Sequence, residues 1–180
     1  MKVFITRHGK TDYNERELVC GVLEAQLTEE GRAQAEELAR ILERDQERNR
    51  ICHIFSSPLK RAVETAGYAA RALGLEIQTD VRLMEVHFGS CEGVGWDDEE
   101  FVRVKRNPFL RYRGGESTID AAHRAYSFMD DLRSWKLDGN VLIVCHGTFA
   151  RILSTYFVDY TLDEYWSTRW KNCELRGYEL

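Results

Sequence analysis

The sequence lacks several features that would place it in a specialised class of protein. No apolar stretch approaches the roughly 20 residues that a membrane-spanning helix needs, and no signal peptide precedes the first predicted strand. The 25 Lys and Arg residues against 30 Asp and Glu give a net charge of −5, so there is no basic excess for nucleic acid. We therefore predict a cytoplasmic protein without a nucleic-acid or membrane partner.

Cysteine and proline are also used sparingly. The five cysteines form no CxxC pair and are odd in number, which argues against a disulfide framework or a zinc knuckle and for reduced thiols. The two prolines, Pro58 and Pro108, mark no linker, and the chain contains no internal repeat or low-complexity tract. Since 180 residues suffice for one hydrophobic core, we predict a single domain over residues 1–180.

Short apolar runs alternate with segments of helical periodicity. Strands are predicted at 2–6, 51–57 and 139–147, with weaker ones over 75–80 and, at the edge of the sheet, over 173–180. Helices are predicted after Thr28 and Ser117, over 148–157, and from Ser57, with Pro58 in its first turn, to Gly74. This alternation predicts an α/β fold with three layers, α/β/α, around a mostly parallel central sheet.

Three of these strands end on polar residues that suit an anion site. The first ends on Arg7, His8 and Gly9, the second leads to Arg61, and the fourth ends on His146 and Gly147. The carboxyl ends of parallel strands meet at one edge of the sheet, where ligands of such folds bind. We therefore expect two guanidinium groups and two imidazoles to share one small volume.

This combination favours a phosphate group. Guanidinium forks match phosphate oxygens, helix N-termini after residues 10, 57 and 147 would add N–H groups, and glycines 9 and 147 would let the backbone approach a ligand. An imidazole held beside a phosphoryl group can attack it and form phosphohistidine. The leaving group then needs a proton, for which Glu85 is the candidate and Glu92 a competitor.

At this point the chain resembles the histidine phosphatase superfamily, in its phosphoglycerate-mutase-like branch. The resemblance lies in an ordered set of segments over essentially the whole chain: RHGKTDYN, LTEEGRAQAE, SSPLKRAVETA, LMEVHFGSCEG, GGES and VCHG. It implies the phosphoglycerate-mutase-like fold and no metal or organic cofactor. It implies His8 as the phosphorylated nucleophile and Glu85 as proton donor. Arg7, Arg61 and His146 would hold the phosphate, with Thr11, Asn14, Gly21 and Gly147 beside the substrate.

Several activities within this family remain open. Mutases resemble one another in a long basic insert before the second catalytic histidine, and this chain has only a short segment there, which favours hydrolysis of a phosphorylated metabolite. Phosphohistidine phosphatases typically lack the acid-bearing segment, which is present here. The chain resembles α-ribazole phosphatases and small broad-specificity phosphatases equally well. A non-catalytic phospho-ligand binding module is the remaining alternative, and either a monomer or a homodimer is compatible with the sequence.

The segment between Glu85 and His146 also carries residues with two interpretations. Lys105, Arg106, Arg111 and Arg113 could bind a second anionic group, or could form a solvated face. In the same way, Phe88, Trp96, Phe101 and Phe109 could line an apolar wall of the site or belong to the core. The three remaining histidines, at 53, 87 and 123, are expected to be structural or exposed.

Overall fold

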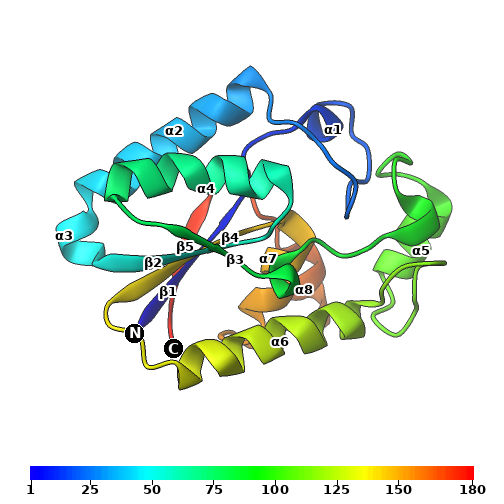
Figure 1. The fold of residues 1–180 in the computed structure, drawn as a ribbon. Coiled ribbons are helices and arrows are strands. Elements are labelled where there is room, and N and C mark those ends of the chain that lie inside the picture. The colour runs from blue at the N-terminus through cyan, green and yellow to red at the C-terminus, as the bar shows by residue number, and fades with distance from the viewer.

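A five-stranded sheet organises the computed structural model, which describes residues 1–180 (Figure 1). The strands are β1 (Lys2–Arg7), β2 (Ile51–Ser56), β3 (Ile77–Thr79), β4 (Asn140–Cys145) and β5 (Leu175–Glu179). Their order across the sheet is β3-β2-β4-β1-β5, and only the edge strand β5 runs antiparallel to its neighbour. The predicted strands and the mostly parallel sheet are confirmed, including the place of the last strand at an edge.

Helices cover both faces of this sheet. They are α1 (Asp12–Glu15), α2 (Glu29–Arg44), α3 (Gln46–Asn49), α4 (Lys60–Leu73), α5 (Glu99–Lys105), α6 (Thr118–Ser134), α7 (Gly147–Ser154) and α8 (Leu162–Ser167). Figure 1 shows α2 and α4 above the sheet and α6, α7 and α8 below it. The three-layer α/β/α architecture is thus confirmed.

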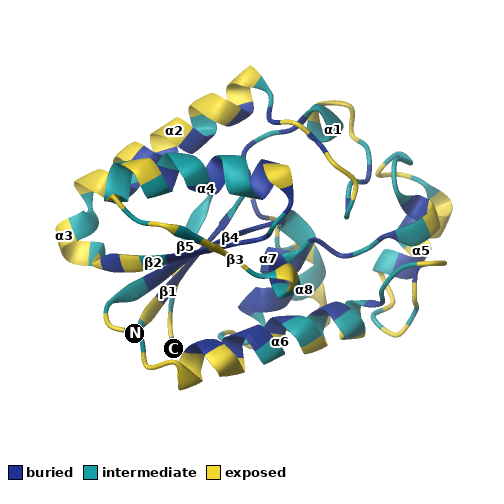
Figure 2. Ribbon diagram, in the orientation of Figure 1, coloured by how far each residue is buried: buried dark blue, intermediate teal, exposed yellow.

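Alternation along the strands explains why two layers of helices are needed. Phe4 and Leu142 belong to the apolar cluster that packs with α2 and α4. Their neighbours Ile5 and Ile143 belong to the cluster on the opposite face, which includes residues of α6 and α7. Successive side chains of a strand point to opposite faces, so these strands must be buried on both sides. Figure 2 shows the resulting buried centre, with exposed residues on the outer sides of α2 and α6.

The helix boundaries follow most of the predicted capping signals. Thr28 accepts a hydrogen bond from Gly31 N–H at the start of α2, and Ser117 forms a capping box with Asp120 at the start of α6. Gly74 ends α4 with φ of 65°, a left-handed conformation that glycine adopts without a steric penalty. These local hydrogen-bond and backbone preferences set where α2 and α6 begin and where α4 ends.

The predicted start of α4 is wrong. The helix begins at Lys60 with Leu59 as its N-cap residue, and no side chain caps it. Ser57 lies before the helix; its hydroxyl accepts from Leu59 N–H over 3.3 Å and also contacts the His146 ring over 2.7 Å. The residue predicted to cap the helix therefore also belongs to the candidate site, and the regular helix starts two residues later than predicted.

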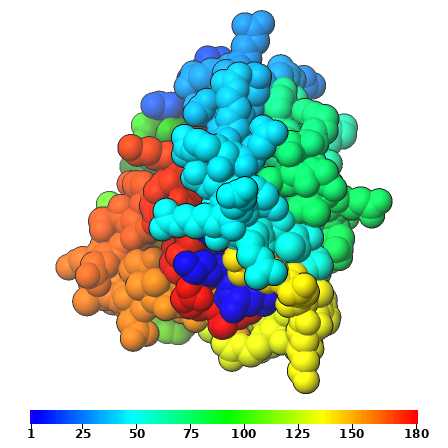
Figure 3. Space-filling model, turned by 90° about the vertical axis from the view of Figure 1, so that its left-hand side faces the viewer, coloured from blue at the N-terminus to red at the C-terminus, as the bar shows by residue number.

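The two ends of the chain lie together, as Figure 3 shows for the first and last residues beside each other. Leu180 N–H donates to the carbonyl oxygen of Met1 over 2.9 Å, continuing the pairing of β1 with β5. None of the helices has the length and apolar character required to cross a lipid bilayer.

Candidate active site

A cavity of about 550 Å³ lies at the carboxyl ends of β1, β2 and β4. Of the residues predicted for the site, it is lined by Arg7, His8, Thr11, Asn14, Arg61, Glu85 and Gly147. His146 is fully buried directly behind this surface, with its ring centroid 5.2 Å from that of His8. The parallel sheet therefore brings the two predicted arginines, the two histidines and the glutamate into one volume.

His8 is held in a defined orientation by the backbone. Its own N–H donates to the carbonyl oxygen of Cys145 on β4, and its Nδ1 lies 2.7 Å from the carbonyl oxygen of Gly9. A carbonyl oxygen can only accept, so Nδ1 carries the proton. In the neutral ring the remaining nitrogen, Nε2, then holds a free lone pair, and no group of the protein binds it.

The surroundings also keep this ring neutral. Burial lowers the pKa of His8 well below 6.5, and the positive charges of Arg61 and Arg7 lower it further. His146 behaves in the same way: burial and the charge of Arg61 lower its pKa well below the ordinary value. Its Nε2 contacts the Ser57 hydroxyl over 2.7 Å, while its Nδ1 has no partner. Both rings are thus uncharged near neutral pH.

The two arginines reach the site from different sides. Arg7 extends from the end of β1 and donates from Nη1 to the carbonyl oxygen of Trp170, while its buried Nε has no acceptor. Arg61, in the first turn of α4, donates to the carbonyl oxygens of Gly21 and Leu23. Neither guanidinium pairs with a carboxylate of the protein. Their positive charge is therefore available to an anion in the cavity.

Glu85 is anchored at the N-terminus of α7. Its Oε1 accepts from Val86 N–H and Phe149 N–H, both over 2.9 Å, and its Oε2 accepts from Thr148 N–H over 3.0 Å. The α7 N-terminus therefore binds this carboxylate, whereas we had expected it to face the phosphate. Each carboxylate oxygen has two lone-pair sites, so Oε2 retains one that can exchange a proton with the cavity.

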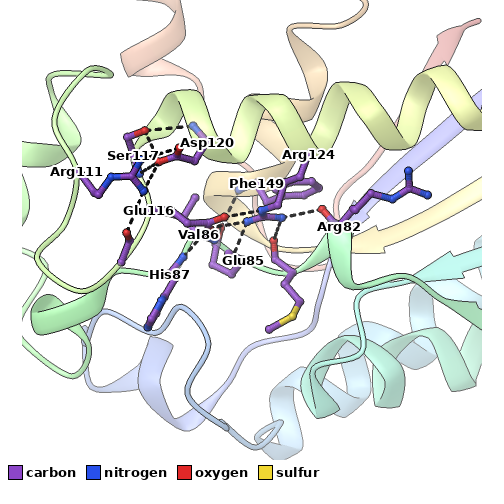
Figure 4. Close-up of polar contacts among 12 residues, drawn as sticks. Arg82, Glu85, Val86, His87, Arg111, Glu116, Ser117, Asp120, Arg124 and Phe149 are labelled. Carbon is purple, nitrogen blue, oxygen red and sulfur yellow. Dashed lines mark hydrogen bonds and ion pairs between the residues drawn. The ribbon is translucent and has the colours of Figure 1, made fainter.

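Arg124 on α6 binds the segment that carries Glu85 (Figure 4). Arg124 donates to the carbonyl oxygens of Arg82, Met84 and Glu85 and pairs with Glu116, whose carboxylate also accepts from His87 N–H. One guanidinium thus holds three carbonyl groups within the four residues that end at Glu85. No sequence pattern predicts this role, because Arg124 lies within a regular amphipathic helix.

The four residues predicted beside the substrate divide into two groups. Thr11 and Asn14 line the cavity and also form the capping box of α1, so the same two side chains fix the start of this helix beside the cavity. Gly147 lines it as well, and a Cβ there would lie 3.2 Å from Arg7 Nε, so the glycine leaves room for the guanidinium. Gly21 does not line the cavity; its carbonyl oxygen binds Arg61.

Two expectations about neighbouring residues change. Gly9 was expected to allow close approach to a ligand, but a Cβ there would collide with the carbonyl oxygen of Gly31 in α2. Glu92, the competing acid, accepts from Gly21 N–H and Val22 N–H and stays outside the cavity lining. Glu92 therefore fixes the loop that binds Arg61, and Glu85 is the carboxylate that the cavity contains.

Residues that sequence reasoning missed support the site from behind. Asn172, just before β5, donates to the carbonyl oxygen of His8 and to Asn14 Oδ1. Thr65 on α4 accepts from Gly9 N–H and so holds the backbone beside His8. Neither has a local sequence signal, because each contact joins segments distant in the chain. No group of three or more His, Cys, Asp or Glu side chains is placed to hold a metal ion.

The chain is similar in sequence and in fold to known proteins. A model of the histidine phosphatase superfamily, branch 1, matches residues 3–180. Phosphoserine phosphatase 1 of Hydrogenobacter thermophilus is 29% identical over 187 aligned positions, covering 100% of this chain and 85% of the relative. Glucosyl-3-phosphoglycerate phosphatase of Mycobacterium tuberculosis is 32% identical over 167, covering 85% and 73%. The structure of an α-ribazole phosphatase from Shigella flexneri shares the fold, with a TM-score of 0.84, 23% identity and coverage of 98% and 89%.

Proposed function

The chain belongs to the histidine phosphatase superfamily, and from this premise we propose that it hydrolyses a small phosphorylated metabolite through a phosphohistidine on His8. Relatives named as phosphatases of phosphoserine and of glucosyl-3-phosphoglycerate support a phosphatase over other activities. The observation that carries the proposal is the single tautomer of His8, whose Nδ1–H is bound to Gly9 and whose Nε2 is free beside the cavity.

In the first half of the reaction, His8 Nε2 attacks phosphorus and the bond to the ester oxygen breaks. The ring gains a positive charge, which the Gly9 carbonyl oxygen stabilises because it accepts the Nδ1–H. Arg7 and Arg61 stabilise the negative charge on the transferring oxygens. Neither guanidinium forms an ion pair with a carboxylate of the protein, so both are available to the phosphoryl oxygens.

Glu85 acts at the ester oxygen in this mechanism. Protonated at Oε2, it donates its proton to the departing alkoxide and becomes a carboxylate. In the second half it accepts a proton from water, the water oxygen attacks phosphorus, and the bond between phosphorus and Nε2 breaks. Inorganic phosphate leaves, and His8 and Glu85 return to their starting states, so the cycle needs no metal or organic cofactor.

The decisive experiment is hydrolysis of p-nitrophenyl phosphate in the presence of a chelator. We expect turnover by the wild-type protein, and a loss of at least about 10⁴-fold in His8→Ala, since removing a covalent nucleophile has effects of that order. The exposed His123 offers a matched control, His123→Ala, which should retain full activity. Rapid quenching at alkaline pH should trap one phosphoryl group on the wild-type protein and none on His8→Ala.

Two other outcomes would contradict the proposal. Folded wild-type protein that binds phosphate but releases no nitrophenol would indicate a phospho-ligand binding module. Isomerisation of 3-phosphoglycerate with its bisphosphate primer, faster than release of phosphate, would indicate a mutase.

A further inference from the structure

The cavity contains more positive charge than one phosphoryl group needs. Besides Arg7 and Arg61 it is lined by Lys105, Arg151, Arg169 and Lys171. Glu85 is the one acidic residue among the lining residues, and its oxygens already accept three backbone N–H groups. The chain as a whole has a net charge of −5, so this concentration of cations is a local property of the site.

Arg151, one of these additional cations, is not an ordinary surface residue. It lies on α7 and is only 4% exposed. Its Nε is buried without an acceptor, and no carboxylate lies within ion-pair distance. The rings of Tyr165 and Trp166 flank the guanidinium at 4.7 and 5.2 Å. Burying an unpaired charge is costly, so an anion that binds beside this guanidinium would stabilise it.

Lys105 and Arg169 lie close to this guanidinium. Burial, together with the positive charges of Arg151 and Arg169, lowers the pKa of Lys105 to about 8. Its ammonium group lies 5.2 Å from the centre of the Phe101 ring and has no carboxylate partner. Three cations from α5, α7 and the segment after α8 thus meet without an anion of the protein between them.

This group lies on other elements than the phosphate pocket. Arg7 ends β1 and Arg61 lies in α4, whereas Lys105 ends α5, Arg151 lies on α7 and Arg169 follows α8. Lys105 and Arg169 also line a second hollow, which neither Arg7 nor Arg61 lines. Glu85 accepts from Thr148 N–H and Phe149 N–H at the start of α7, the helix that carries Arg151. A substrate whose ester oxygen is beside Glu85 would therefore extend its non-phosphate part toward Lys105, Arg151 and Arg169.

We propose that the substrate carries a second anionic group, a carboxylate or a second phosphate, which binds Lys105, Arg151 and Arg169. This inference rests on the proposed phosphatase function and specifies its substrate class. The bound anion supplies the counter-charge that the protein omits, and it orients the ester oxygen toward Glu85. The sequence left two interpretations of the basic segment, a second anion site or a solvated face. In this proposal Lys105 belongs to the anion site, whereas Arg111 pairs with Asp120.

Matched substrates test the proposal. O-phosphoserine and O-phosphoethanolamine differ only by one carboxylate, and glycerol 1,3-bisphosphate and glycerol 3-phosphate differ by one phosphate. We expect kcat/KM to be about tenfold or more higher for the acid-bearing member of at least one pair, the effect of one favourable charge contact. The carboxylate pair and the phosphate pair show which of the two groups is preferred.

Variants locate the preference. Lys105→Met and, at an exposed position, Arg169→Met should bring the ratio within each preferred pair close to one. Hydrolysis of p-nitrophenyl phosphate, which has no second acid, should fall clearly less than hydrolysis of the preferred acid-bearing substrate, because only the latter uses the second anion site. Lys136→Met, an exposed lysine after α6, serves as the control for loss of one positive charge and should preserve the ratio.

The failures of the two proposals are distinguishable. If the wild-type protein hydrolyses p-nitrophenyl phosphate but prefers neither acid-bearing substrate, the second anion site is refuted while the phosphatase stands. Equal losses for p-nitrophenyl phosphate and for the acid-bearing substrates in Lys105→Met would refute it as well. If the wild-type protein hydrolyses none of these esters, the phosphatase proposal itself has failed.

Discussion

Two buried, neutral histidines make the ligand-free protein sensitive to mild acid. Burial and the neighbouring arginines lower the pKa values of His8 and His146 well below 6.5 in the folded protein. In the unfolded chain both rings titrate near the ordinary value. Below pH 6.5 the unfolded state therefore binds more protons than the folded state, and the free energy of unfolding falls as pH falls. Above 6.5 this contribution to stability is fully present.

The size of the effect follows from linkage. Acidification from about pH 7.5 to about pH 5.5 should lower the free energy of unfolding by about 1.4 kcal/mol for each ring and about 2.7 kcal/mol for the pair. Asp and Glu residues titrate at lower pH and contribute little over this range. The contribution of the histidines to the pH dependence of unfolding can therefore be measured apart from the acid denaturation caused by carboxylates.

Urea unfolding at several pH values measures it, in buffers without phosphate because a bound dianion would offset the added positive charge. His8→Asn should remove about half of the pH dependence, and its amide N–H can still donate to the Gly9 carbonyl oxygen. His123→Asn, at an exposed position, should leave the dependence unchanged. Wild-type stability that is flat over this range, or an equal slope in His8→Asn, would refute the reasoning.

Two further predictions concern the groups around the histidines. Glu85→Gln should reduce kcat/KM more for alkyl phosphates than for p-nitrophenyl phosphate, because only the alkoxide requires a proton; equal losses would contradict its role as acid. Ser57→Ala removes the partner of His146 Nε2 and should lower both turnover and the free energy of unfolding, the latter by about 1 to 3 kcal/mol in urea titrations. Unchanged values of both would show that this contact does not hold the ring.

The principal site residues could be predicted because each is tied to a local signal. Arg7, His8 and His146 follow directly on apolar runs, and Arg61 comes shortly after another, so any parallel sheet places them at one edge. Glu85 lies in a loop without regular periodicity, so it could be named as a candidate acid, but only the family resemblance favoured it over Glu92. The same loop contains Glu92, and only the backbone hydrogen bonds of the folded chain distinguish the two carboxylates.

The contacts that tune the site could not be predicted. The partner of Arg124 is a loop about 40 residues away, Asn172 reaches back to His8, and Ser57 contacts His146. Such pairings depend on the packing of α6, α7 and β5 against the sheet, and no local pattern encodes them. The Ser57 hydroxyl makes a local bond to Leu59 N–H and a tertiary one to His146, and only the local one has a signal in the sequence.

The amino-acid sequence by itself determined the α/β architecture and which residues meet at the sheet edge, because strand periodicity and strand order along the chain are local properties. Only the tertiary structure decided the charge state and surroundings of those residues. Whether a histidine is neutral, or an arginine lacks a counter-ion, depends on every group that folding brings near it. The unpaired Arg151 beside Lys105 is such a case, since the two residues are 46 positions apart and meet only in the folded cavity.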